Sequence, residues 1–321
     1  MTKLDLKDKK ILYELDLNSR QSFHQIAKKV GLSKDSIIYR VNKLKQDGII
    51  KQFHTVIDVN KLGYISFRLY LKLQNTTPKK EQEIINFLKK QKIVVWMVSI
   101  DGKYDLGIWA LTKSLRNMND LWKRLLDQYV NYIDERWLTI LTDVKSFPRS
   151  FLLDQKQNLE EFDYITSNPR AEVDAKDIEI IRILAPDSRI SCLEVAKRVG
   201  LTPKTVISRI KILEEKKVIV GYRTRFDMEK IGYQYFKLQI DLQNTTREEK
   251  LKFRQFVKQH PNIIHDEKIL GGNDLDIELQ VKGIKEYREI LEEIKAKFSK
   301  MIKDHRHMIF YKEHKNLFFP V

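Results

Sequence analysis

Apolar residues recur at helical spacing in three consecutive segments near the start of the chain. Their inward positions are Ile11, Leu12 and Leu15, then Ile26, Ala27 and Val30, then Ile37, Val41 and Leu44. Gly31 ends the second segment where the chain must turn sharply, and the left-handed conformation of such a turn favours glycine. Ser33 is a natural N-cap for the third helix. Three helices with a glycine turn before the third predict a helix-turn-helix.

The pattern then changes to strands with one buried face. A strand from Ile49-Ile50 to Val56-Ile57 is expected to form a wing. Apolar and polar residues alternate strictly from Ile65 to Leu73, which is typical of a half-buried strand. The segments that follow are a helix around Ile84, Phe87 and Leu88, strands at Ile93–Ile100 and Tyr104–Ala110, a helix at about Leu115–Leu126 and a strand at Tyr132–Leu141. This β-α-β-β-α-β order predicts a ferredoxin-like sandwich.

The whole pattern occurs twice, at a constant offset of 169 residues. Gln74-Asn75-Thr76-Thr77 recurs as Gln243-Asn244-Thr245-Thr246, and Ser19-Arg20 recurs as Ser188-Arg189. Gly31-Leu32 likewise recurs as Gly200-Leu201. Two long repeats predict two globular units and exclude a stacked solenoid.

The expected fold is therefore α+β, with two tandem copies of a winged helix-turn-helix followed by a ferredoxin-like βαββαβ sandwich. The predicted boundaries are 1–60 and 174–229 for the DNA-binding domains, 61–145 and 230–321 for the sandwiches, and 146–173 for a linker. The linker carries Pro148, Asn168 and Pro169 around an apolar Phe151-Leu152-Leu153 segment, which predicts at most one short helix within it.

The composition of the chain favours a protein that binds a polyanion and argues against a disulfide-bonded or membrane-spanning one. The formal net charge is +16 over 321 residues, a surplus that attracts a polyanion. Cys192 is the single cysteine, so no disulfide forms within the chain, and no apolar run approaches the ~20 residues that span a bilayer. We expect a soluble cytoplasmic protein without a membrane contact. Known phosphate-loop, dinucleotide and hydrolase motifs are missing, so no cofactor is expected.

The outward face of the third helix in each copy is polar and basic. Its residues, the expected DNA contacts, are Lys34, Ser36, Tyr39, Arg40 and Lys43 in the first copy and Lys204, Thr205, Ser208, Arg209 and Lys211 in the second. A helix fits the major groove of double-stranded DNA, where such side chains contact base edges and phosphates. The alternative is that each face is an ordinary solvated helix surface. A polar, basic face that occurs twice in register on a basic chain favours DNA binding.

This arrangement resembles the Lrp/AsnC family of transcription regulators. The first copy carries Ser19-Arg20, Ile26-Ala27-Lys28-Lys29-Val30-Gly31-Leu32-Ser33, Arg40-Val41, Leu44 and Gly48-Ile49-Ile50, and the second has Val195-Ala196-Lys197-Arg198-Val199-Gly200-Leu201-Thr202-Pro203, Arg209-Ile210 and Leu213 at the same spacing. The resemblance covers nearly the whole chain. It implies a sequence-specific regulator that dimerises through the sandwich, so two fused units would pair within one chain as a pseudo-dimer. Further homo-oligomerisation through the sandwich faces is plausible.

The resemblance also implies a site for an amino acid or related small effector near the sandwich hairpin. Carried over by position, that site comprises Gly102, Tyr104 and Asp105 in the first copy and Gly271 and Asp274 in the second. Glycine permits close backbone approach and aspartate pairs with an ammonium group. A Gly-x-x-Asp hairpin is also what a tight β-turn requires without any ligand.

Two alternatives to a simple regulator remain. Siroheme decarboxylases resemble this architecture and would need histidines or arginines lining a tetrapyrrole pocket, whereas the intact basic helices favour a protein that is not an enzyme. If the DNA-binding domains no longer bound DNA, the recognition helices would be expected to have lost their basic residues. Arg40 and Arg209 argue against that alternative. His305 and His307 share a strand face, but no further ligand lies near them in sequence and no metal site is expected.

Overall fold

The computed structural model describes residues 4–155, 162–166, 169–317 and 319–320. Its first elements are α1 (Leu6–Leu17), α2 (Phe23–Val30), α3 (Lys34–Gln46), β1 (Ile50–Ile57), β2 (Ile65–Leu73), α4 (Pro78–Lys89), β3 (Val94–Gly102), β4 (Leu106–Thr112), α5 (Leu115–Tyr129), β5 (Ile133–Ser146) and β6 (Phe162–Ile165). The later elements are α6 (Ala175–Leu184), α7 (Cys192–Val199), α8 (Pro203–Glu215), β7 (Ile219–Phe226), β8 (Gln234–Leu242), α9 (Arg247–Gln259), β9 (Ile263–Leu270), β10 (Leu275–Val281), α10 (Ile284–Phe298) and β11 (Ile302–Asn316). Short 3-10 turns lie at Val59–Leu62, Val130–Tyr132, Ser150–Leu153 and Glu229–Ile231. In the described part of the chain no helix is long and apolar enough to cross a membrane.

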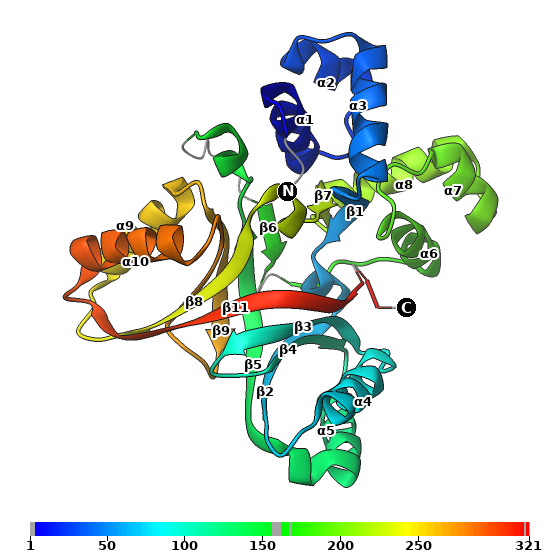
Figure 1. The fold of residues 1–321 in the computed structure, drawn as a ribbon. Coiled ribbons are helices and arrows are strands. Elements are labelled where there is room, and N and C mark those ends of the chain that lie inside the picture. Colours follow the sequence, from blue (N-terminus) through cyan, green and yellow to red (C-terminus); the bar gives the residue numbers. More distant parts are fainter. Residues whose placement is uncertain (1–3, 156–161, 167–168, 318, 321) are drawn as a thin grey trace.

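The strands of both halves form one continuous sheet. Its order is β2-β4-β3-β11-β8-β10-β9-β5-β6, and β2 also pairs with β5. This last pairing closes eight of the strands into a ring, a barrel-like sheet from which β6 extends (Figure 1). The sequence predicts two sandwiches that pair as distinct units, and the structure differs because their outer strands join edge to edge in one sheet. β3 pairs with β11 and β5 pairs with β9, so backbone groups at both outer edges of each half are satisfied by the other half.

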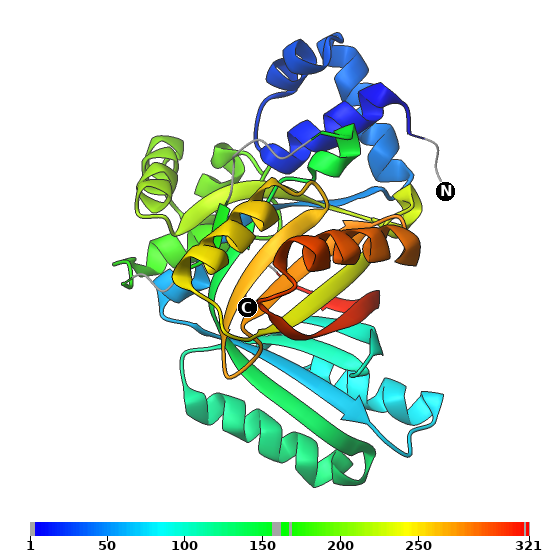
Figure 2. The ribbon, with the colours of Figure 1, turned by 90° about the vertical axis from the view of Figure 1, so that its left-hand side faces the viewer.

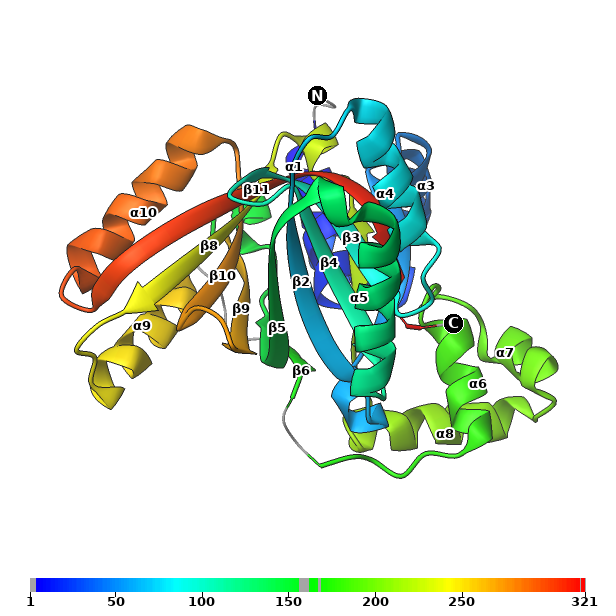
Figure 3. The same ribbon diagram turned by 90° about the horizontal axis from the view of Figure 1, so that it is seen from below.

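Helices cover the outside of this ring on two opposite sides. Figure 3 shows α4 and α5 on one side of the strands and α9 and α10 on the other. The alternation predicted for β2 is confirmed, since Phe67, Leu69 and Leu71 pack against residues of α4 and α5. In β8, Phe236, Leu238 and Ile240 pack against α9 and α10. The intervening residues of each strand therefore face the interior of the ring.

The three-helix segments stand at one end of the barrel and are joined by a two-stranded ribbon. Figure 2 shows this arrangement from a second side. β1 and β7 pair antiparallel with each other, from Ile50 opposite Phe226 to Ile57 opposite Ile219. The predicted wing within each copy is thus replaced by a ribbon shared between copies. A single strand leaves its backbone groups unpaired, and the equivalent strand of the other half supplies the partner.

The start of the segment predicted as a linker packs against the first three-helix unit, and its Asn168 lies outside the described residues. Phe151 and Leu152, in the Ser150–Leu153 turn, are buried among the side chains of α1 and its neighbours. Arg149 pairs with the buried carboxylate of Asp16. The strand β6 within the segment pairs with β5, an element that the sequence pattern did not predict.

Candidate functional site

The turn between α2 and α3 has the geometry of a helix-turn-helix. Gly31 has a φ of 71° at the C-cap of α2, and Ser33 accepts a hydrogen bond from the backbone N–H of Ser36 at the start of α3. The equivalent turn has Gly200 at a φ of 69° and Thr202 as the N-cap of α8. Both caps and both glycines were predicted from the sequence, and the structure confirms them.

Arg40 and Arg209 hold the third helix of each unit against the first. Nη1 of Arg40 donates to Asp5 and Asp8, both at 2.7 Å, and these acids form the capping box of α1. Nη1 of Arg209 donates to the equivalent Asp174 and Asp177, both at 2.8 Å. Sequence reasoning assigned both arginines to DNA alone and missed this role. Each side chain is just under a third exposed, so one face of the guanidinium remains available to solvent.

Most of the other predicted DNA-contacting residues are exposed on α3 or α8. They are Lys34, Tyr39 and Lys43 in the first unit and Lys204, Ser208 and Lys211 in the second. Ser36 and Thr205 are half-buried, because their hydroxyl groups bond to those of the N-caps Ser33 and Thr202, both at 2.8 Å. They therefore contribute to the start of each helix as well as to its outer face.

The two exposed faces differ in chemistry. Near its middle, α3 presents Tyr39, which is 69 % exposed, whereas α8 presents Ile207 and Ile212, which are 56 % and 44 % exposed. Nζ of Lys211 also lies 3.8 Å from Glu215 on its own helix. The surface of α8 is therefore more apolar and less basic than that of α3.

The two helix-turn-helix units meet at a symmetric buried contact beside the β1–β7 ribbon. The hydroxyl oxygens of Ser19 and Ser188 lie 2.7 Å apart, and both residues are fully buried. Arg20 donates to the carbonyl of Ser188 at 2.9 Å, and Arg189 donates to the carbonyl of Ser19 at 2.5 Å. These reciprocal bonds fix one unit against the other.

The residues predicted for an effector site are only partly brought together. Asp105 accepts bonds from the backbone of Leu73 at 2.6 Å and from Lys72 at 2.9 Å, and Asp274 accepts one from the backbone of Leu242 at 2.8 Å. Both carboxylates thus close the hairpin onto the neighbouring strand, as a turn without a ligand requires. A side chain at Gly102, whose φ is 147°, would meet the carbonyl oxygen of His307 at 3.0 Å.

Tyr104 and Gly271 do line a groove of about 280 Å³ between the two halves. The other residues of this groove are Lys103, Glu135, Arg136, Trp137, Asp241, Gly272, Asn273 and Arg306. Trp137 stacks on Tyr104 with ring centroids 6.0 Å apart and donates to the carbonyl of Gly271 at 3.1 Å. The groove is shallow, and its charges are paired within each half, Lys103 with Glu135 in the first and Arg306 with Asp241 in the second.

A larger cavity, of about 410 Å³, lies between the β1–β7 ribbon and the barrel. Arg149, Arg223, Arg225 and His54 line it on the ribbon side, and Arg68, Trp109 and His265 line it on the barrel side. The pKa of His54 lies well below its ordinary value, because burial and then the charges of Arg223, Arg149 and Arg225 oppose protonation. No sequence pattern indicated this cavity, since its walls come from strands of both halves.

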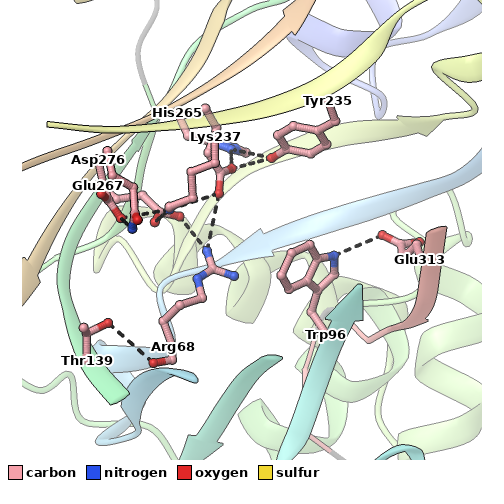
Figure 4. Close-up of polar contacts among 11 residues, drawn as sticks. Arg68, Trp96, Thr139, Tyr235, Lys237, His265, Glu267, Asp276 and Glu313 are labelled. Atoms are coloured by element: carbon pink, nitrogen blue, oxygen red, sulfur yellow. Dashed lines mark hydrogen bonds and ion pairs between the residues drawn. The ribbon is translucent and has the colours of Figure 1, made fainter. Parts of the chain in front are cut away.

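Beneath the cavity, buried charged side chains meet inside the ring of strands (Figure 4). Nζ of Lys237 is fully buried, 3.1 Å from Asp276 and 3.4 Å from Glu278, and it also pairs with Glu267. Nη2 of Arg68 donates to Glu267 at 2.6 Å. Burial disfavours a charged lysine, yet Asp276 and Glu267 hold the pKa of Lys237 well above its ordinary value. Burial raises the pKa of Asp276 to about 6, despite the nearby ammonium group.

His305 and His307 both lie on β11, as predicted. Within the described residues, no three or more His, Cys, Asp or Glu side chains are grouped so that they could hold a metal ion. Cys192 is half-buried at the start of α7 and accepts a hydrogen bond from Arg20 at 3.3 Å.

Comparison with known proteins identifies the family. Residues 4–51 match the model of a winged helix-turn-helix DNA-binding domain, and residues 173–214 match that of the AsnC-type helix-turn-helix domain. The transcriptional regulator Ptr1 of Methanocaldococcus jannaschii is 34 % identical over 118 residues, which are 36 % of this chain and 76 % of that protein. The chain belongs to the Lrp/AsnC family of transcription regulators.

A second Lrp/AsnC relative is the Bkd operon transcriptional regulator of Pseudomonas aeruginosa. It is 30 % identical over 122 residues, which cover 38 % of this chain and 80 % of that protein. Among solved structures, the siroheme decarboxylase NirDL aligns with a TM-score of 0.63 over 97 % of this chain and 93 % of its own, at 15 % identity. This likeness shows a common fold over both halves of the chain.

Proposed function

We propose that this Lrp/AsnC protein binds duplex DNA sequence-specifically, with one chain acting as the equivalent of a dimer. The observation that carries the proposal is the paired arrangement of α3 and α8 on one β1–β7 ribbon. The reciprocal Ser19 and Ser188 contacts hold the two units rigidly to each other. Two recognition helices held in this way contact two half-sites at one fixed spacing.

The two half-sites are expected to differ. Lys34, Tyr39 and Lys43 on α3 offer donors and positive charge to bases and phosphates. On α8, Ile207 and Ile212 provide apolar contact, which in the major groove suits the methyl group of thymine. The operator is therefore an imperfect palindrome in which the half facing α3 supplies more of the salt-dependent affinity.

An amino acid or related effector fits this function as its modulator. The groove that contains Tyr104 and Gly271 supports it, since residues of both halves line that groove. A ligand there would contact both halves at once and bias how they pair. The carboxylates of Asp105 and Asp274 are engaged in the hairpins, so an ammonium group would meet Glu135 or Asp241, in competition with Lys103 or Arg306.

A second candidate function is tetrapyrrole chemistry of the kind that the siroheme decarboxylase performs. The observation that favours it is the central cavity, where arginines and the histidines His54 and His265 line the wall. Against it, the acids Asp227, Glu229, Glu267, Glu278 and Glu313 also line the cavity and would repel a polycarboxylate. Titration with a tetrapyrrole, followed by its absorbance spectrum, tests this candidate independently of DNA.

The test of DNA binding is selection of bound sequences from a random duplex library at physiological salt. We would compare the wild type with the double variant Lys34→Glu and Lys43→Glu. Arginine variants are less suitable, because Arg40 and Arg209 hold their helices in place. The control is Lys79→Glu on α4 with Lys90→Glu at its C-cap, which makes the same charge change far from α3 (Figure 1).

The proposal expects an enriched motif with two half-sites in the wild type and the control, and loss of one half-site in the α3 variant. Binding without any enriched motif would contradict sequence-specific recognition. An equal loss in the control would assign the affinity to net charge alone. A motif with a single half-site in the wild type would contradict the dimer-equivalent arrangement.

A further inference from the structure

Two neighbouring side chains in the wall of the central cavity hold buried hydrogen-bond donors without an acceptor. Arg68 on β2 and Trp109 on β4 are cross-strand partners, and both line the cavity. Nε of Arg68 and the indole Nε1 of Trp109 have no hydrogen-bond partner in the described chain, and Arg68 is only 7 % exposed. A buried donor that is left unsatisfied is destabilising. Two such donors side by side therefore indicate an acceptor that the protein does not supply.

The rest of the Arg68 guanidinium is already fixed in place. Its Nη2 donates to Glu267 at 2.6 Å, and its central carbon lies 5.0 Å from the centre of the Trp96 ring (Figure 4). These contacts hold Nε in one orientation before any ligand arrives. Arg68 and Trp109 lie opposite each other on paired strands, where Cβ atoms are about 5 Å apart, so a group with two acceptor oxygens placed between them has one oxygen for each donor. A carboxylate has that geometry.

The remaining walls fit a flat aromatic group. The Trp109 ring lies 6.0 Å from that of Tyr164, and the rings of Tyr235 and Phe310 are 5.2 Å apart on another part of the wall. On the ribbon side, Arg149, Arg223 and Arg225 also line the cavity, where Arg149 and Arg223 pair with Asp16 and Arg225 pairs with Glu313. Flat rings pack against such aromatic walls. A ligand with a single carboxylate brings less negative charge near Glu267 and Glu278 than a polycarboxylate does.

We propose that the central cavity binds a small aromatic carboxylic acid, whose carboxylate accepts hydrogen bonds from Nε of Arg68 and Nε1 of Trp109. The volume of about 410 Å³ lies within the range of small-ligand sites, roughly 300–1,000 Å³. This site is separate from the groove at Tyr104 and goes beyond the proposed function. Its ligand would contact both the barrel and the β1–β7 ribbon that joins the DNA-binding units.

The experiment is calorimetric titration of the full-length protein, without DNA, with indole-3-acetate, phenylpyruvate, salicylate and 2-naphthoate. Each acid is paired with its primary amide, which keeps the ring and removes the charge. We expect at least one acid to bind, with its amide weaker by roughly tenfold or more, since hydrogen bonds to a charged group are the stronger kind.

Three variants locate the site. Trp109→Phe keeps an aromatic ring and removes Nε1. Arg68→Lys keeps the positive charge and removes Nε. Each variant should therefore bind the acid roughly tenfold more weakly. Trp122→Phe is the matched control, because Trp122 stacks with Arg136 outside the cavity and should leave the affinity unchanged. Thermal unfolding of each variant verifies that the cavity still forms, and Trp109→Phe decides the outcome if Arg68→Lys does not fold.

Two results would overturn the inference. The first is that no acid binds more tightly than its amide, which would mean that water satisfies the two donors. The second is an acid whose affinity is the same in Trp109→Phe as in the wild type. If a porphyrin polycarboxylate binds and none of the four acids does, the inference is overturned in the first way. The cavity is then assigned to the second candidate function, tetrapyrrole chemistry. None of these outcomes depends on the DNA selection.

Discussion

The two halves of the barrel line its interior with different chemistry. The first half contributes mainly apolar side chains there, while the second contributes a set of acids. The equivalent positions, 169 residues apart, are Val98 and Glu267, Gly107 and Asp276, and Trp109 and Glu278. Both halves keep a base at one equivalent pair, Arg68 and Lys237. The acids of the second half thus neutralise the bases of both halves.

This difference shows what fusion of two units permits. A symmetric dimer must repeat every buried residue, so two second halves would bury these three acids twice against two lysines. Two first halves would bury two arginines without an acid. Unpaired buried charges are strongly destabilising, so the interior favours the pairing of unlike halves. The outer helical faces, α3 and α8, have diverged in the same way.

The largest expected effect on stability comes from removing a buried base from the second half of the barrel. Lys237→Met should lower the free energy of unfolding by about 3–5 kcal/mol, because it leaves Glu267, Asp276 and Glu278 with one buried base instead of two. Urea denaturation at pH 7 measures this loss. Lys72→Met is the control, since its pair with Asp105 is partly exposed and should contribute below about 1 kcal/mol. Equal losses in the two variants would contradict the account.

The next prediction concerns the two recognition helices. Lys34→Ala with Lys43→Ala on α3 should weaken specific DNA binding by about 1–3 kcal/mol and reduce its dependence on salt. Lys204→Ala with Lys211→Ala on α8 should have a smaller effect, because Glu215 already offsets the charge of Lys211. Affinity measured at several salt concentrations compares them. A larger loss from α8 would reverse the assignment of the stronger half-site.

A third effect follows from the raised pKa of Asp276, about 6 in the folded protein against 3.8 ordinarily. The folded state binds this proton more tightly, so acidification stabilises the fold, and the effect is lost as pH rises through 6. This group should add about 1 kcal/mol between pH 7 and pH 5. Asp276→Asn should remove that gain, whereas the equivalent position in the first half, Gly107, cannot titrate. Unfolding by urea across this pH range measures the slope, and an unchanged slope would exclude Asp276 as its source.

The smallest expected effect concerns the serine contact, where the two halves of the chain are alike. Ser19→Ala and Ser188→Ala should each lower the free energy of unfolding by about 1 kcal/mol, since each removes one partner of the same buried hydrogen bond. The double variant should cost little more than either single one. Thermal unfolding of the three variants shows whether the losses are equal. Clearly unequal losses would mean that the two serines contribute unequally to stability, although the geometry of their contact is symmetric.

Local features of this molecule could be predicted from sequence, and contacts between the halves could not. Ser33, Thr202 and the glycines before them gave the helix-turn-helix, because caps and left-handed turns depend on adjacent residues. Nothing local distinguishes a strand edge that faces solvent from one that meets β9 or β11. For the same reason the cavity went unpredicted.

Within the candidate site the same limit applies residue by residue. Exposed Lys34, Tyr39 and Lys43 follow from helical period alone. The ion pairs of Arg40 with Asp5 and Asp8 span more than 30 positions and depend on how α3 packs on α1. Lys237 lies on a strand face that alternation alone predicts to be solvated, and it is buried only because the ring closes over it.

Closure of the ring also has a consequence for how the chain is made on the ribosome. The first half presents β3 and β5 soon after its synthesis, but their partners β11 and β9 belong to the C-terminal half. At about 5–20 residues per second, translation from Ser146 to Asn316 takes roughly ten to thirty seconds. The edge of β3 lacks its partner for that whole interval, and the edge of β5 lacks its partner until β9 has been made. Chaperone binding to the arrested nascent chain should therefore decline only when translation has passed β11.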